Sequence, residues 1–137
     1  MNKKQKSLNN KGFSLVELII VVAIMAVLVG VLAPTYLGYV EKSKKSTDVQ
    51  NAQELATSIA VKAAIDDSAI TTSTVTAINA TNINTISELT TVPEIKVGSS
   101  YAWYYEYDGV EVTIYLGDGT NTYEVYPTVA TGSPWEQ

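Results

Sequence analysis

The sequence predicts an α+β fold, in which one long N-terminal helix packs on a C-terminal antiparallel sheet of three to four strands. Three observations lead to this prediction. Residues 18–33 carry no charged or polar side chain, apolar residues then recur at spacings of three and four up to about Ile65, and from Ser100 onward apolar and polar residues alternate. Periods near 3.6 and 2 are those of a helix and a strand that each bury one face. The chain of 137 residues has room for one such domain beside one membrane segment.

The first two segments are a leader and a membrane helix. Residues 1–12 are polar and rich in lysine, and we expect no regular structure there. Residues 13–40 are long enough to cross a bilayer core of about 30 Å. A secretory signal peptide and a buried core helix are the alternatives, and Glu17 inside the run and Pro34 after it count against the signal peptide. The positive-inside rule alone does not orient this helix, because Lys3, Lys4, Lys6 and Lys11 are nearly balanced by Lys42, Lys44 and Lys45.

Residues 41–66 are predicted to continue the same helix as an amphipathic half. Its apolar face consists of Val49, Ala52, Ala56, Ile59 and Ala63. Polar residues lie elsewhere on the helical wheel, namely Asp48, Gln50, Glu54 and Lys62. A helix from Phe13 to Ile65 would be roughly 80 Å long at 1.5 Å per residue. It would therefore extend well beyond the membrane.

Residues 67–99 are rich in Thr, Ser, Asn and Ala, and we expect an irregular connection between helix and sheet. Within it, the sequence from Thr85 to Glu88 fits a capping box, which predicts a short helical turn that ends before Pro93. A Thr-rich loop without any helix is the alternative.

Residues 100–137 are predicted to form the sheet, with strands at 101–107, 110–116 and 122–126. Asp108-Gly109 predicts a two-residue hairpin, because a type I′ turn needs positive φ at both of its central positions. Tyr104 is the tyrosine we assign to the surface. The alternating aromatic residues assigned to the core are Tyr101, Trp103, Tyr105 and Tyr107. The apolar face of the sheet needs a partner, and the alanine-rich stripe of the helix is the candidate.

Composition excludes several classes of function. The chain has no Cys and no His, which removes thiol nucleophiles, disulfides and His-ligated metals. It has no Arg, and from Ser46 onward two lysines face twelve acids, which argues against nucleic acid as a direct partner. Residues 117–121 lack the spaced carboxylates of a calcium loop. We therefore predict no catalytic residues, no cofactor and no metal site, and we expect that the protein is not an enzyme.

The most informative stretch is Lys11-Gly12-Phe13-Ser14-Leu15-Val16-Glu17-Leu18, followed by the apolar run. It resembles the type IV pilin superfamily, whose signature is a basic leader ending in glycine, an N-terminal Phe, a Thr/Ser-Leu-X-Glu continuation and a hydrophobic helix with a proline near its end. Each element matches, and beyond the helix the resemblance is one of architecture only. The short leader and the lack of Cys are most like pilins of Gram-positive bacteria. Many Gram-negative pilins instead close a C-terminal loop with a disulfide.

The resemblance implies two processing steps at the end of the leader. A membrane-embedded prepilin peptidase would cut between Gly12 and Phe13, and the same enzyme would methylate the new amine on Phe13. A residue without a side chain at position 12 lets extended backbone lie close to a protease. A glycine that merely separates the leader from the helix is the alternative.

Glu17 is the residue on which the predicted assembly depends. An ionised carboxylate in hydrocarbon costs at least a few kcal/mol unless it is paired or solvated. Cleavage would create an ammonium group on Phe13, four residues earlier on the same helix face. The resemblance implies that Glu17 pairs with the N-terminal amine of a neighbouring subunit in the filament core. The alternative is a glutamate that reaches the membrane interface from the first helical turn.

Gly30 and Pro34 are the predicted site of a helix break. Proline removes a backbone donor and crowds the carbonyl four residues earlier, which here belongs to Gly30. In related filaments this stretch unwinds on assembly, and the resemblance extends that expectation to residues 30–34. An ordinary kink in a transmembrane helix is the alternative.

The leading functional hypothesis is a structural subunit of a type IV pilus that serves adhesion, motility or biofilm formation. The expected partners are identical or related pilin subunits, prepilin peptidase, the pilus assembly platform and the membrane. The subunit would first span the cell membrane with its N-terminus in the cytoplasm and then join an extracellular filament. Alternatives are a pseudopilin of a type II secretion or competence DNA-uptake machine, and a membrane-anchored binding module or hydrolase that never polymerises.

Overall fold

The computed structural model describes residues 11–66, 68, 70 and 74–137. Helix α1 (Leu15–Ile65) is followed by strand β1 (Thr76–Ala77), helix α2 (Ile83–Ile86) and strands β2 (Ala102–Tyr107), β3 (Val112–Gly117) and β4 (Thr122–Tyr126). This confirms the predicted fold class, a long N-terminal helix followed by a four-stranded antiparallel sheet. By its internal contacts, the chain divides into two units, Met1–Gly38 and Tyr39–Gln137.

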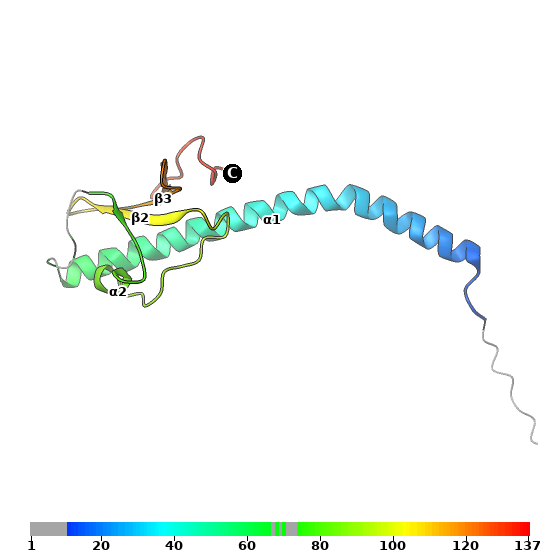
Figure 1. The fold of residues 1–137 in the computed structure, drawn as a ribbon, viewed down its shortest axis with the longest axis horizontal. Helices are drawn as coiled ribbons and strands as arrows, with labels where there is room; N and C mark the ends of the chain where they lie inside the picture. The colour runs from blue at the N-terminus through cyan, green and yellow to red at the C-terminus, as the bar shows by residue number, and fades with distance from the viewer. Residues whose placement is uncertain (1–10, 67, 69, 71–73) are drawn as a thin grey trace, which may run out of the picture. The chain divides into compact units, whose positions relative to one another are not determined.

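The core of the second unit lies between α1 and the sheet, whose strands run along this part of the helix (Figure 1). Helix α1 contributes the predicted alanine-rich stripe, and Leu55 adds a large side chain to it that the prediction did not include. Tyr101 and Tyr107 are only partly buried, at the margin of the core. Alternate residues of β2 and β3 face the helix, and the pairing of β3 with β4 has a register shift between Ile114 and Tyr115. The buried hydrophobic side chains of the sheet are those of Trp103, Tyr105, Val112, Ile114, Leu116 and Val125.

The sheet has the order β1-β2-β3-β4 with every neighbouring pair antiparallel. Strand β1 lies in the segment predicted to be irregular. It is two residues long and pairs Thr76 with Tyr105 and Ala77 with Tyr104. Two residues are too few to show a periodicity, so the sequence does not predict this strand. It forms because its backbone pairs with the free edge of β2.

The turn between β2 and β3 differs from the predicted two-residue hairpin at Asp108-Gly109. Tyr107 pairs with Val112, and the N–H of Asp108 donates to the carbonyl of Glu111 at 3.3 Å, so the turn is closed by Asp108 and Glu111. Gly109 takes a positive φ of 96°. The Asp108 carboxylate accepts the N–H groups of Val110 and Glu111 at 2.8 and 2.7 Å, which shifts the turn by one residue. Val110, predicted to begin the strand, is therefore left exposed.

The turn between β3 and β4 repeats this arrangement. Asp118 accepts the N–H groups of Thr120 and Asn121 at 2.9 and 2.8 Å, and Gly119 has a φ of 90°. These backbone hydrogen bonds hold the pKa of Asp118 below its usual value, and those from Glu111 and Val110 do the same for the pKa of Asp108. Both carboxylates therefore stabilise their turns in the ionised form.

A group whose pKa is lower in the folded state contributes stability above its unfolded pKa and loses it as pH falls through the folded value. For these two aspartates the loss falls below about pH 4. We therefore expect the variant Asp108→Ala/Asp118→Ala to show a shallower fall of melting temperature between pH 5 and pH 2 than the unaltered chain. Tryptophan fluorescence melts in detergent micelles would measure this. If the melting temperatures of the two proteins fall equally between pH 5 and pH 2, the carboxylates do not stabilise the turns.

Helix α2 corrects the predicted capping box at residues 85–88. The helical turn exists, but it spans Ile83–Ile86 and is preceded by Asn82, while Ser87 is its extended C-cap. The Ser87 hydroxyl donates to the carbonyl of Ile83 at 2.7 Å. The turn begins earlier because the side chain of Asn79 accepts the N–H groups of Thr81 and Asn82, which organises the approach to the helix.

Asp48 corrects the predicted polar face of α1, because its carboxylate is completely buried. One carboxylate oxygen accepts the backbone N–H of Lys96 at 2.7 Å. The other accepts the N–H of Val97 at 3.0 Å and the indole N–H of Trp135 at 2.9 Å. A buried carboxylate is tolerated where several donors replace water. Asp48 thus ties the helix to the loop before β2 and to the C-terminal segment.

The C-terminal segment is held beside α1 by further contacts that the sequence did not predict. Trp135 is completely buried and meets the ring of Tyr101 edge to face, with 4.7 Å between ring centroids. The side chain of Lys45 donates to the carbonyl of Glu136 at 3.2 Å. The chain therefore secures its end through a buried tryptophan and hydrogen bonds, with no cysteine available for a disulfide.

Candidate functional site: the N-terminus of helix α1

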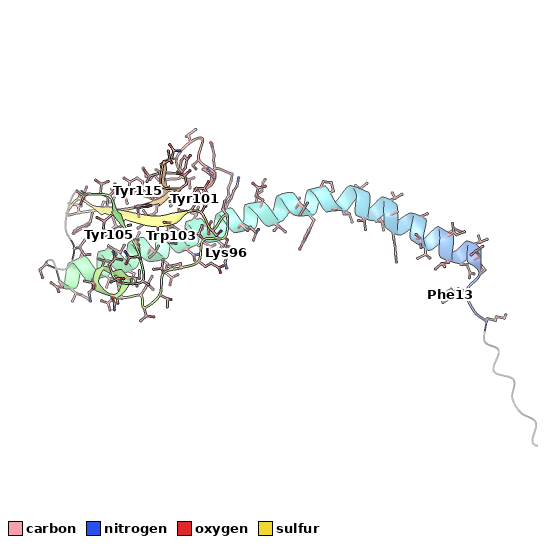
Figure 2. All side chains as sticks on the ribbon, viewed as in Figure 1. Phe13, Lys96, Tyr101, Trp103, Tyr105 and Tyr115 are labelled. Carbon is pink, nitrogen blue, oxygen red and sulfur yellow. The ribbon has the colours of Figure 1, made fainter. Side chains whose placement is uncertain are left out.

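The predicted cleavage point lies just before α1, outside regular secondary structure. Gly12 and Phe13 are both exposed, and Phe13 is 91% accessible at the start of the helix (Figure 2). A Cβ atom added to Gly12 would meet no atom within 4 Å. The fold of the chain therefore does not require glycine at this position. A requirement for glycine must come from a partner that approaches the backbone closely.

Ser14 and Glu17 form a capping box at the first turn of α1. The Ser14 N–H donates to a carboxylate oxygen of Glu17 at 2.9 Å, and the Glu17 N–H donates to the Ser14 hydroxyl at 3.2 Å. Each side chain thus satisfies a backbone donor that the helix itself leaves without a partner. This contact was not predicted, although the spacing Ser-X-X-Glu before an apolar run indicates it.

The capping box has a consequence for the predicted role of Glu17. It directs the carboxylate back toward the beginning of the helix, to the residue next to Phe13. Cleavage after Gly12 would leave the Ser14 N–H in place and add an ammonium group one residue before it. The carboxylate thus already points to the end of the chain where the new charge would appear.

The apolar half of α1 has no covering surface within the described chain. Its best window of 18 residues has a mean hydropathy of 3.1, and none of that window is buried. By length and composition this is the one helix in the described part of the chain that could cross a membrane. Exposed apolar surface on this scale needs lipid or other protein chains around it.

Gly30 and Pro34, the predicted helix break, both lie inside α1. A Cβ atom at Gly30 would meet no atom within 4 Å, so the fold of the chain does not require glycine there. Pro34 cannot donate to the carbonyl of Gly30. The hydroxyl of Thr35, one residue later, lies 3.5 Å from the carbonyl of Val31. The predicted unwinding concerns an assembled filament and stays a prediction.

Comparison with known proteins identifies the N-terminal stretch. Residues 7–33 match the family model described as the prokaryotic N-terminal methylation motif. The match includes Gly12, Phe13 and Glu17. A search of curated proteins and a search of solved structures found no match. The chain thus carries a prepilin-type N-terminus, as predicted, and this indicates a structural subunit rather than an enzyme. The match does not distinguish Gram-positive from Gram-negative pilins.

Proposed function

We propose that this protein is the structural subunit of a type IV pilus, and that α1 acts first as its membrane anchor and then as the core of its filament. The observation that carries the proposal is the position of Glu17. Its carboxylate lies at the first turn of a long apolar helix with no cover of its own, and it points toward the predicted cleavage point. The methylation motif over residues 7–33 supports the same reading.

Processing would proceed at the cytoplasmic face of the membrane. Prepilin peptidase removes residues 1–12, frees the amine of Phe13 and methylates it. The cut lies in exposed backbone before the helix begins, where an enzyme can bind the chain in an extended form. Position 12 is open enough to accept a side chain without disturbing the fold.

Assembly would then exchange the partner of Glu17. In the single chain the carboxylate accepts the Ser14 N–H. In the filament it pairs with the ammonium group of a neighbouring Phe13, which removes two isolated charges from an apolar environment. The pair would also set the axial position of each new subunit, because the two groups meet at only one register.

N-terminal mass spectrometry of material sheared from the cell surface tests the proposal. We expect a mature chain that begins with N-methylated Phe13. An intact Met1, a cut elsewhere in the chain, or absence of the protein from sheared filaments would overturn the proposal.

Gly12→Leu supplies the matched variant for this experiment. Because a side chain fits at this position, the folded domain should be unchanged, and its melting temperature should equal that of the unaltered chain. The leader should nevertheless remain attached, and no filaments should form. Normal cleavage of this variant would show that the peptidase does not read position 12.

A further inference from the structure

Two tyrosines of the sheet stand apart from its core. Five others, at positions 101, 105, 107, 123 and 126, belong to the core or pack against it. Tyr104 and Tyr115 do neither, although both are partly buried. They occupy positions on β2 and β3 whose side chains alternate with the buried ones. Figure 2 shows Tyr115 on the side of the sheet opposite Trp103 and Tyr105, which point toward α1.

The ring of Tyr104 lies against the backbone at Gly117. A Cβ atom built on Gly117 would come within 2.9 Å of the Tyr104 ring, closer than real atoms approach. Glycine thus leaves the space that lets this ring lie down on the sheet. Tyr104 is paired with Tyr115, and Tyr115 with Glu124, so the three residues form one row across β2, β3 and β4.

Two carboxylates flank Tyr115. The Tyr115 hydroxyl donates to Glu106 at 2.9 Å, and Glu124 accepts the hydroxyl of Thr128 at 2.9 Å. Each of these bonds uses one carboxylate oxygen, and the other oxygen makes no hydrogen bond with the described residues. Burial raises the pKa of Tyr115 to about 12, and the hydrogen bond to Glu106 and the charges of Glu106 and Glu124 act in the same direction. We call Tyr104, Tyr115, Glu106 and Glu124 the tyrosine face.

The tyrosine face carries negative charge that the described chain does not neutralise. The three ion pairs found in the described residues engage other carboxylates, those of Glu41, Glu88 and Glu94. After Lys96 the sequence has no basic residue and six acidic ones. Charge complementarity therefore favours a cationic partner for this face.

Helix α1 covers the opposite side of the sheet, so the tyrosine face points away from it. If α1 forms the filament core, as the proposed function holds, the face is directed outward and recurs once in every subunit. A repeating site gains most from a polymeric partner, because linked contacts convert weak single affinities into strong binding.

We propose that the tyrosine face binds an amine-bearing polysaccharide, in which pyranose rings lie on Tyr104 and protonated amines pair with Glu106 and Glu124. The exposed side of an aromatic ring offers flat apolar area to the C–H face of a sugar, and it also attracts cations. Carboxylates form their stronger hydrogen bonds with charged donors. The location of the face outside the filament rests on the proposed function, whereas its chemistry belongs to the single subunit.

Titration of the full chain in detergent micelles tests the chemistry without any filament. The probes are glucosamine oligomers, their fully N-acetylated counterparts and lysine oligomers of similar length. We expect the glucosamine oligomers to bind most tightly, with at least about fivefold weaker binding after N-acetylation, which removes the charge. Equal binding of the two sugars, or tighter binding of lysine oligomers, would overturn the proposal.

Variants assign the binding to the tyrosine face. Glu106→Gln/Glu124→Gln should weaken glucosamine binding about tenfold, and Tyr104→Leu about fivefold, while Tyr104→Phe keeps the ring and should retain binding. Glu54→Gln/Glu111→Gln removes two exposed charges elsewhere and is the matched control. Melting temperatures verify that each variant is folded. If the control variant and Glu106→Gln/Glu124→Gln lose the same affinity for glucosamine oligomers, binding depends on the overall charge of the protein. That result would refute the site.

Binding by sheared filaments tests separately whether the tyrosine face lies on the filament surface. Filaments of the unaltered chain should bind immobilised glucosamine polymer more tightly than the micellar subunit, and Glu106→Gln/Glu124→Gln filaments should lose this gain. If no filaments form at all, the proposed function fails while the micelle titration still decides the site. If filaments form but bind no better than single subunits, the outward placement of the face is wrong.

Discussion

Replacing Glu17 by Ala is expected to abolish surface filaments while the precursor is still made and inserted into the membrane. The variant would leave the ammonium group of a neighbouring Phe13 without its counter-charge in an apolar filament core. Breaking a buried ion pair by removing one partner costs about 3–5 kcal/mol. A loss of this size at every subunit contact would prevent growth of a polymer. Electron microscopy of cells, with immunoblots of membrane and sheared fractions, would measure the effect.

Two further substitutions separate the charge of Glu17 from its capping role. Glu17→Gln keeps an acceptor for the Ser14 N–H but carries no charge, and we expect it to fail in assembly as well. Ser14→Ala removes part of the capping box, which costs about 1 kcal/mol of helix stability, and should leave filaments present. Normal filaments containing the Glu17→Ala protein would show that assembly does not depend on Glu17. Normal filaments with Glu17→Gln alone would show that the charge is unnecessary.

Replacing Asp48 by Ala should destabilise the folded domain by about 3 kcal/mol or more, because three donors lose their acceptor in a buried site. These donors are the backbone N–H groups of Lys96 and Val97 and the indole of Trp135. The C-terminal segment should then become sensitive to protease in the native state, and the fluorescence of Trp135 should shift toward that of an exposed indole. Urea unfolding in micelles and limited proteolysis would measure the two effects.

The control for Asp48 lies on the same helix. Glu54→Ala removes an exposed carboxylate and should change the free energy of unfolding by no more than about 0.5 kcal/mol. Asp48→Asn offers one acceptor where the site presents three donors, so it should also be clearly destabilised. If Asp48→Ala unfolds at the same urea concentration as Glu54→Ala, the carboxylate does not hold the C-terminal segment in place.

The helix and the three longer strands could be predicted because their signals are local. The stripe from Ala52 to Ala63 repeats at helical spacing, and the buried residues Trp103 and Tyr105 alternate with less buried neighbours. The roles of Gly12, Phe13 and Glu17 were inferred from one short stretch, which the methylation motif covers, and these roles stay predictions. The capping contact between Ser14 and Glu17 is equally local, and the spacing of three residues before an apolar run is its sequence signal.

Other features depend on residues far apart in the sequence. Asp48 was predicted on the polar side of the helix because of its charge, although its spacing of four from Ala52 places it on the buried face. The sequence around it does not show that donors from residues 96, 97 and 135 will surround it. The two residues of β1 are too few to show alternation, and they are a strand only because β2 lies beside them. The shift of the turn at Asp108 follows from a side-chain carboxylate that competes with the backbone for N–H donors.

The sequence by itself determined a long helix ending at Ile65, a sheet of alternating strands and a prepilin-type N-terminus, because hydrophobic periodicity and a contiguous motif are encoded over a few turns or strands. The tertiary structure alone decided that Asp48 is buried, that Trp135 packs the C-terminal segment against α1, and that Tyr104 and Tyr115 share one face with two carboxylates that form no ion pair within the described residues. Burial and charge neutralisation depend on which groups meet in space. These groups come into contact only when the helix, the loop before β2 and the C-terminal segment pack together.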